Sequence, residues 1–146
     1  MKKSICCILL LLSVLSCLMA CNFTTNTSGD FAGEAESFSK VEEMMVALAQ
    51  NNTSDAKQTI HPKSVEESDA AIVQMNNFLA GREAVSIQQV SIHVTTSTGT
   101  AGKTKEEYVT YAATLSDGDI VYLSVVYLSD NDGDGFTSFQ MVLGLV

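Results

Sequence analysis

The chain has 146 residues, which suits a single domain once a short targeting segment is set aside. It carries 8 lysine and arginine residues against 17 acidic residues, and its formal net charge is −9. An acidic surface repels the phosphate backbone of nucleic acids, so we expect no nucleic-acid partner. All the cysteines fall within the first 21 residues, which excludes a disulfide or a cysteine metal site from the rest of the chain: Cys6, Cys7, Cys17 and Cys21.

Residues 1–20 have the pattern of a secretory signal peptide. Lys2 and Lys3 supply a positive start, and an almost entirely apolar run extends from Ile5 to Leu15. This run is short for a membrane-spanning helix, which needs about 20 residues. The small residue Ala20 then precedes Cys21. We therefore predict that residues 1–20 are removed.

The tetrapeptide Leu18-Met19-Ala20-Cys21 resembles the bacterial lipobox, in which a leucine lies three residues before the cysteine and a small residue lies directly before it. This resemblance to bacterial lipoproteins covers only the first 21 residues. It implies transfer of diacylglycerol to the Cys21 sulfur and cleavage between Ala20 and Cys21. It also implies a location in the cell envelope, with the domain on the extracytoplasmic side of the membrane. The alternative is an ordinary secretory signal with an incidental cysteine.

A lipid anchor suits the charge of the mature chain. Six lysine and arginine residues would remain against 17 acidic ones, a formal charge of −11, so no basic patch would hold the domain to an anionic membrane. Residues 21–36 are rich in Asn, Thr, Ser, Gly and Glu and show no hydrophobic period. We interpret them as the lipidated cysteine and a flexible tether, and residues 37–146 as one domain.

Helical patterns occupy the first half of the domain. Ser39 and Glu42 fit a capping box, in which each side chain satisfies a backbone donor of the other residue. An apolar stripe with helical spacing follows and is formed by Val41, Met44, Met45 and Leu48. Asn51 and Asn52 end this helix.

Two further helices are predicted. A short one over 54–60 ends at His61-Pro62, because the residue before a proline disfavours helix. The next begins at a capping box of Ser64 and Glu67 and ends at Gly81, which suits a left-handed C-cap. Its buried face consists of Ala71, Ile72, Met75, Phe78 and Leu79.

From Val85 onwards the apolar residues recur with the period of two that is typical of strands. A change of phase predicts a bulge near Gln88-Gln89, and a loop is predicted over 95–102. Asp117-Gly118 is a tight-turn signal, and a second loop is predicted over 130–135. The four strands are marked by Val90, Ile92 and Val94; by Val109, Tyr111, Ala113 and Leu115; by the run 120–128; and by Phe139, Met141, Leu143 and Leu145.

Helices followed by strands predict an α+β domain, with N-terminal helices packed on one face of a curved four-stranded antiparallel sheet. Residues 39–146 resemble the nuclear transport factor 2-like cone, a superfamily that includes isomerase-like and cyclase-like proteins. The local match consists of Thr53-Ser54-Asp55-Ala56, Ile60-His61-Pro62 and the helix that ends at Gly81. Such cones carry a strand between the helices, which is not predicted here, and a cystatin-like fold is the alternative. The resemblance implies a pocket between helices and sheet.

Three side chains are candidates for lining such a pocket: Tyr111, Tyr122 and His93. Against this, Tyr111 and Tyr122 fit core positions beside Ile120 and Phe139, and His93 fits an exposed strand position. His61, at a helix end, is expected to cap or to pack. The acids Glu106, Glu107, Asp117 and Asp119 lie near strand ends or turns, where solvation is expected. No set of catalytic residues is recognisable.

The segment Asp130-Asn131-Asp132-Gly133-Asp134-Gly135 resembles the start of a calcium loop, whose carboxylates at positions 1, 3 and 5 converge on the ion. That pattern needs a glutamate at position 12, which here is Met141. The two interpretations are therefore a plain hairpin turn and a weak calcium site formed by Asp130, Asp132 and Asp134. No other metal and no cofactor is predicted.

These patterns favour a lipid-anchored, non-enzymatic domain that binds a small ligand or a protein. A homodimer formed through the sheet is a further expectation. The alternatives are an isomerase-like or cyclase-like enzyme that uses the cone pocket, and a structural protein of the envelope. An enzyme of that kind needs a buried acid or histidine beside a tyrosine inside the cone.

Overall fold

The computed structural model describes residues 23–28, 34–99 and 102–144. The predicted signal peptide, Ala20 and Cys21 lie outside the described residues. The elements, in chain order, are β1 (Phe23–Ser28), α2 (Phe38–Ala49), α3 (Thr53–Lys57), a 3₁₀ turn (Pro62–Ser64), α4 (Val65–Leu79), β2 (Ala84–Gly99), β3 (Gly102–Leu115), β4 (Ile120–Asp130) and β5 (Gly133–Leu143). None of the described helices is long and apolar enough to cross a membrane.

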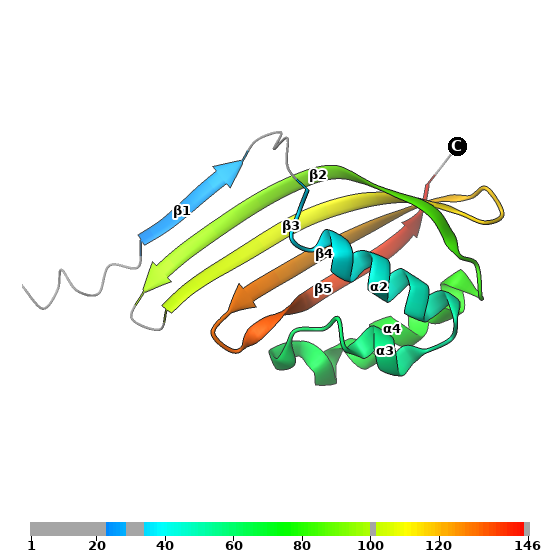
Figure 1. Ribbon diagram of the computed structural model, residues 1–146, viewed down its shortest axis with the longest axis horizontal. Helices are drawn as coiled ribbons and strands as arrows, with labels where there is room; N and C mark the ends of the chain where they lie inside the picture. The colour runs from blue at the N-terminus through cyan, green and yellow to red at the C-terminus, as the bar shows by residue number, and fades with distance from the viewer. Residues whose placement is uncertain (1–22, 29–33, 100–101, 145–146) are drawn as a thin grey trace, which may run out of the picture.

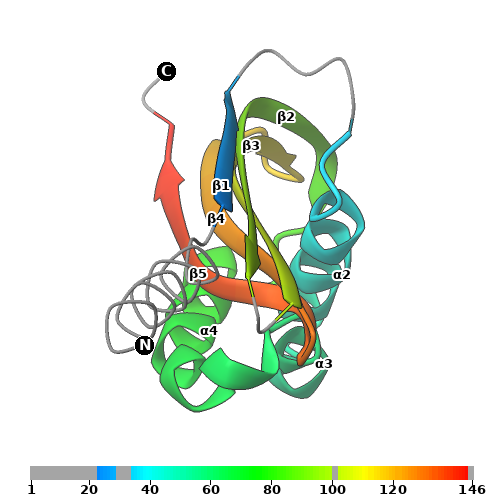
Figure 2. The same cartoon turned by 90° about the vertical axis from the view of Figure 1, so that its left-hand side faces the viewer.

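The strands form one antiparallel sheet in the order β1-β2-β3-β4-β5, so each strand pairs with its neighbour in sequence. The described helices lie together against one face of the curved sheet, and none of them lies on its other face (Figures 1 and 2). The prediction of an α+β domain with an antiparallel sheet is therefore confirmed, and its four strands are β2 to β5.

The tether prediction is wrong for Phe23–Ser28, which pair as β1 with residues 93–98 of β2. The loop predicted over 95–102 is likewise mostly strand, since β2 continues to Gly99 and β3 begins at Gly102. Both segments are rich in threonine and serine. Threonine is β-branched and suits a strand, but a polar strand has no hydrophobic alternation by which the sequence could reveal it.

The predicted bulge in β2 is confirmed, and the structure contains two. The pairing with β3 shifts between Ala84 and Ser86 and again between Gln89 and Ser91. Val85 and Val90 are the extra residues, and their side chains are 66% and 57% exposed. An extra residue bends a strand and re-aims the side chains around it. Two valines are thereby turned towards solvent.

The predictions of two capping boxes are wrong, because the side-chain hydrogen bonds that define such a box are not formed. The N-cap of α2 is Ser37, two residues before the predicted position, and neither Ser37 nor Ser64 caps its helix through its side chain. The helix ends are closer to expectation. Asn51 has a positive φ of 57° after α2, and Ala80 and Gly81 have positive φ after α4.

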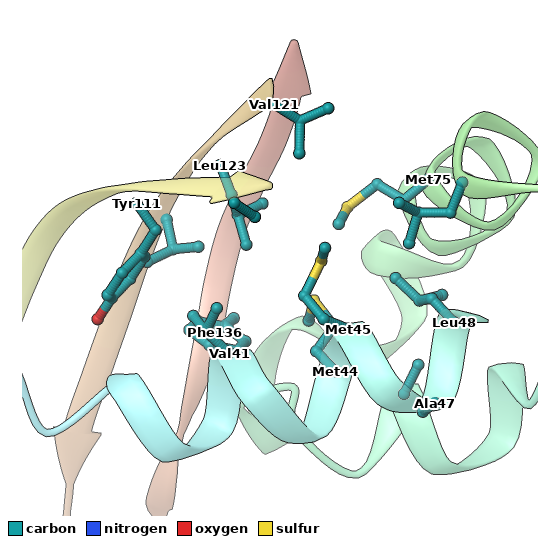
Figure 3. Close-up of a cluster of buried hydrophobic side chains, with 14 of the residues drawn as sticks. Val41, Met44, Met45, Ala47, Leu48, Met75, Tyr111, Val121, Leu123 and Phe136 are labelled. Carbon is teal, nitrogen blue, oxygen red and sulfur yellow. The ribbon is translucent and has the colours of Figure 1, made fainter. Parts of the chain in front are cut away.

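Side chains of α2 and α4 pack closely against the middle of the sheet (Figure 3). Each of the following is at most 4% exposed: Val41, Met44, Met45 and Leu48 of α2; Ile72, Met75 and Leu79 of α4; and Tyr111, Val121, Leu123 and Phe136 of the sheet. The helical spacing on α2 and α4 and the alternation on β3 and β4 place these residues on facing surfaces. The predicted core is confirmed for α2 and, on α4, for Ile72, Met75 and Leu79, whereas Phe78 and Ala71 are only partly buried.

A second contact joins the helical layer to the sheet. The Phe136 N–H donates to the Thr59 carbonyl oxygen at 2.9 Å, and the His61 N–H donates to the Phe136 carbonyl oxygen at 3.0 Å. This bridge requires Gly135, because a Cβ at that position would lie 2.6 Å from the carbonyl carbon of Ile60 and 2.8 Å from the oxygen of Thr59. The glycine is therefore needed for a close approach of two backbones.

Candidate functional site

Three side chains of the sheet hold the chain just before α2. Gln89 Oε1 accepts from the Ala35 N–H at 2.9 Å. The carboxylate of Glu107 accepts from the N–H groups of Glu36 at 3.3 Å and Ser37 at 3.1 Å. The hydroxyls of Tyr111 and Ser37 are 2.8 Å apart. We call this set, residues 35–37 with Gln89, Glu107 and Tyr111, the entry clamp.

The entry clamp is a buried polar cluster. Glu107 is 1% exposed and Tyr111 is fully buried, so the expectation that Glu107 is solvated is wrong. Lys105 Nζ lies 2.9 Å from carboxylate oxygens of both Glu107 and Glu36. Burial lowers the pKa of Lys105, but the hydrogen bonds to these two carboxylates outweigh it and leave the pKa raised. Burial raises the pKa of Tyr111 to about 12, so its hydroxyl stays protonated at neutral pH.

An acid beside a tyrosine is the arrangement that an isomerase-like site would need. Both oxygens of Glu107, however, already accept bonds from the main chain, and Oε1 also contacts Lys105. The Tyr111 hydroxyl is likewise engaged by Ser37. A general base must reach the proton that it abstracts, and these bonds occupy the carboxylate. The contacts suit a structural role, namely fixing the start of α2.

The acidic loop between β4 and β5 is a hairpin whose carboxylates bind protein groups. Asp130 and Asp132 lie 2.6 and 2.8 Å from Lys63 Nζ, and Asp134 accepts from the Tyr127 hydroxyl at 2.8 Å. The calcium interpretation needs three converging carboxylates, but no group of three or more His, Cys, Asp or Glu residues is placed to hold a metal ion in the described part of the chain. The hydrogen bond from Lys63, above all, lowers the pKa of Asp130 to about 2.

His61 joins this loop to the helical layer. It is fully buried, and its Nδ1 accepts from the Lys63 N–H at 3.2 Å. The proton of a neutral ring then lies on Nε2, which is 3.2 Å from Asp130 Oδ1. The expectation that His61 caps and packs is confirmed, since it is the N-cap of the 3₁₀ turn.

The three predicted pocket residues do not meet. Tyr111 faces the core, whereas His93 and Tyr122 lie on the face of the sheet that points away from α2, α3 and α4. His93 packs against Tyr108, with ring centroids 6.0 Å apart, in a shallow hollow lined also by Thr110, Ser124, Ser138 and Gln140. Ile120 and Tyr122 are 37% and 39% exposed, so their prediction as core residues is wrong.

A groove of about 310 Å³ opens between α2 and the start of β2. We call it the α2–β2 groove. It is lined by Glu42, Met45, Val46, Ala49 and Gln50 of α2 and by Glu83, Ala84, Val85, Ser86 and Ile87 at the start of β2. Val46 and Val85 are 57% and 66% exposed, so the groove presents apolar surface to solvent.

Sequence reasoning missed this groove, although a signal for it exists. Val46 lies off the buried stripe of α2, and Val85 lies out of phase with the later residues of β2. Each is an apolar residue that breaks the period of its own element. Taken singly, such residues are ordinary on a protein surface. The structure brings these two to the lining of one groove.

Comparisons with protein-family models, with curated proteins and with solved structures find no match to this chain.

We predict that Glu107→Ala lowers the free energy of unfolding by about 2–3 kcal/mol. The reason is that the buried N–H of Ser37, the part-buried N–H of Glu36 and Lys105 lose their acceptor. Urea denaturation followed by circular dichroism measures the change. Glu106→Ala, one residue away on the opposite face, is the matched control and should change stability by less than about 0.5 kcal/mol. If the two substitutions lower the free energy of unfolding equally, the hydrogen bonds of the entry clamp do not stabilise the fold as proposed.

Proposed function

We propose that this chain is a bacterial lipoprotein, anchored in the cell envelope through Cys21, whose domain binds a ligand or a protein partner in the α2–β2 groove. The observation that carries the binding proposal is the groove itself. It exposes Val46 and Val85 in one hollow whose rim holds the carboxylates of Glu42 and Glu83. Apolar surface with a few convergent polar groups is typical of binding sites.

The close packing at the centre of the core supports binding over isomerase-like or cyclase-like catalysis. A cone pocket would have to lie between α2, α4 and the sheet, where Met45, Met75 and Leu123 pack together (Figure 3). The acid and the tyrosine nearest to that space, Glu107 and Tyr111, are engaged in the entry clamp. We infer further that the fold is nuclear transport factor 2-like. Three helices followed by a meander, with Ile60 bridged to β5, support this assignment.

The lipobox supports the anchor, and β1 suggests where the groove would lie relative to it. Phe23 pairs with Thr98, at the end of β2 that is remote from α2 (Figure 1). Cys21 precedes Phe23 by two residues, which reach at most about 7 Å. The groove lies at the other end of β2, roughly 35 Å along the strand at about 3.3 Å per residue. On this proposal the anchor would attach near the Phe23 end of β1, and the groove lies near the opposite end of β2.

The anchor is tested by Cys21→Ser in cells that process lipoproteins. The unsubstituted protein should fractionate with membranes and carry a diacylglyceryl-modified Cys21 by mass spectrometry. The variant should lose both properties, because its hydroxyl cannot replace the lipidated thiol. Cys17→Ser, within the signal, is the matched control and should change neither property. An unmodified Cys21 in the unsubstituted protein, or cleavage at another position, would refute the anchor.

The groove is tested with Nile red, an uncharged apolar dye that fluoresces when it leaves water. Val46→Asp and Val85→Asp should each weaken dye binding about tenfold, because they place a charge in the apolar lining. Val73→Asp on α4 and Val90→Asp at the second bulge are the matched controls. They alter equally exposed valines, 53% and 57%, outside the groove lining. If the controls weaken the dye as strongly, the groove is not its binding site.

A further inference from the structure

The α2–β2 groove continues across α2 into a second hollow, between α2 and α3. Its lining consists of Ser39, Glu42, Glu43, Val46, Ala47, Gln50, Asp55 and Gln58. Glu42, Val46 and Gln50 line both hollows. They recur every four residues and therefore form one row along α2, about 12 Å long at 1.5 Å per residue. We call the two hollows and this row the α2 ridge surface.

The α2 ridge surface carries charge of one sign. Its two linings contain the carboxylates of Glu42, Glu43, Asp55 and Glu83 and no lysine or arginine. The basic residues nearest in sequence are Lys40, Lys57 and Arg82, and all three have other partners. Lys40 Nζ lies 3.9 Å from a carboxylate oxygen of Asp134. Arg82 contacts both Asp117 and Asp119 at about 3 Å, and Lys57 pairs with Asp69 at 2.8 Å. No lysine or arginine pairs with Glu42, Glu43 or Glu83 within residues 34–99 and 102–144.

We propose that the occupant of the α2–β2 groove is a basic amphipathic peptide segment of a partner protein, an inference that rests on the proposed binding function of the groove. Its apolar side chains would contact Met45, Val46 and Val85. Its lysine or arginine side chains would meet the carboxylates of the rim. Charge complementarity selects this class, because a phosphorylated or otherwise anionic ligand would be repelled by four carboxylates.

The shape of the surface favours a peptide over a small cation. The two hollows lie on either side of α2, and a ligand that fills both must cross the helix, whose diameter with side chains is about 10–12 Å. A peptide of two or three helical turns has that length, and it presents apolar residues on one face and basic residues on the other. Because the four carboxylates lie at the surface, their contribution should fall as salt is raised.

The experiment uses the mature chain, residues 21–146, with Cys21→Ser, and three synthetic dodecapeptides. The first repeats Leu-Lys-Lys-Leu, the second replaces each lysine by glutamate, and the third is twelve lysines. Calorimetric titration should give binding for the first peptide alone at 0.15 M salt, and at least tenfold weaker binding at 0.5 M. Glu42→Lys and Glu83→Lys should each weaken it three- to tenfold. Val46→Asn and Val85→Asn, which remove apolar surface without adding charge, should also weaken it.

Glu66→Lys on α4 makes the same change in net charge outside both linings and should leave the affinity within a factor of two. If twelve lysines bind as tightly as the first peptide, or if Glu66→Lys weakens binding as much as Glu42→Lys, the attraction is only that of an acidic surface and the proposal is overturned. If the glutamate peptide binds instead, or if no peptide binds while Nile red still responds to Val85→Asp, the peptide class is wrong but the groove stands. If neither probe responds to the groove variants, both proposals fail.

Discussion

The carboxylate of Glu107 links the sheet to the chain at the start of the helical layer. It is buried on the inner face of β3, yet its partners are N–H groups about 70 residues earlier in the chain. A buried carboxylate without partners is costly, so this side chain constrains the position of the chain that precedes α2. With Gln89 and Tyr111 it sets where α2 begins. The apolar stripe of α2 then determines which face of the helix meets the core.

The α2–β2 groove lies beside the part of α2 that the entry clamp does not contact. The clamp acts before the first turn of α2, while the α2–β2 groove is lined by the later turns of that helix and by the first residues of β2. At that point β2 contains its first bulge, which turns Val85 outward. A regular strand would alternate its side chains between core and solvent, but the bulge breaks this rule and leaves apolar surface beside the helix. The entry clamp, which fixes only the start of α2, and the first bulge of β2 together account for the groove beside a packed core.

Much of the fold could be predicted from the sequence, and the successes have a common cause. Amphipathic periods predict α2, α4, β3 and β4 because each element buries one face. Asp117-Gly118 predicts its hairpin because Gly118, with a φ of +93°, suits a tight turn. The failures involve polar groups. β1 and the last residues of β2, 95–99, pair through their backbones and have no hydrophobic alternation. Glu107 lies near a strand end in the sequence, and only the distant N–H groups of Glu36 and Ser37 explain why it is buried.

The candidate site was less predictable than the fold. The sequence of the acidic loop matches the first half of a calcium loop. In the structure, however, Asp130 and Asp132 pair with Lys63, and Gly135 allows the close approach of the backbone of residues 59–61. Those partners come from a distant segment that no local motif contains. Val46 and Val85 were visible as interruptions of two separate periods, but their meeting in one groove depends on the placement of α2. Hydrophobic periodicity therefore predicts the core, whereas the binding surface depends on how the elements pack together.

We propose that the binding surface is the α2–β2 groove, and neither the core between helices and sheet nor the face of the sheet that bears His93 and Tyr108. Methyl NMR spectra of the mature chain, recorded during titration with the Leu-Lys-Lys-Leu peptide, test this claim residue by residue. We expect shifts for the methyl groups of Met45, Val46 and Val85, with the core methyl groups of Leu123 unchanged. Shifts confined instead to Val126, beside His93 and Tyr108 on the opposite face of the sheet, would contradict it.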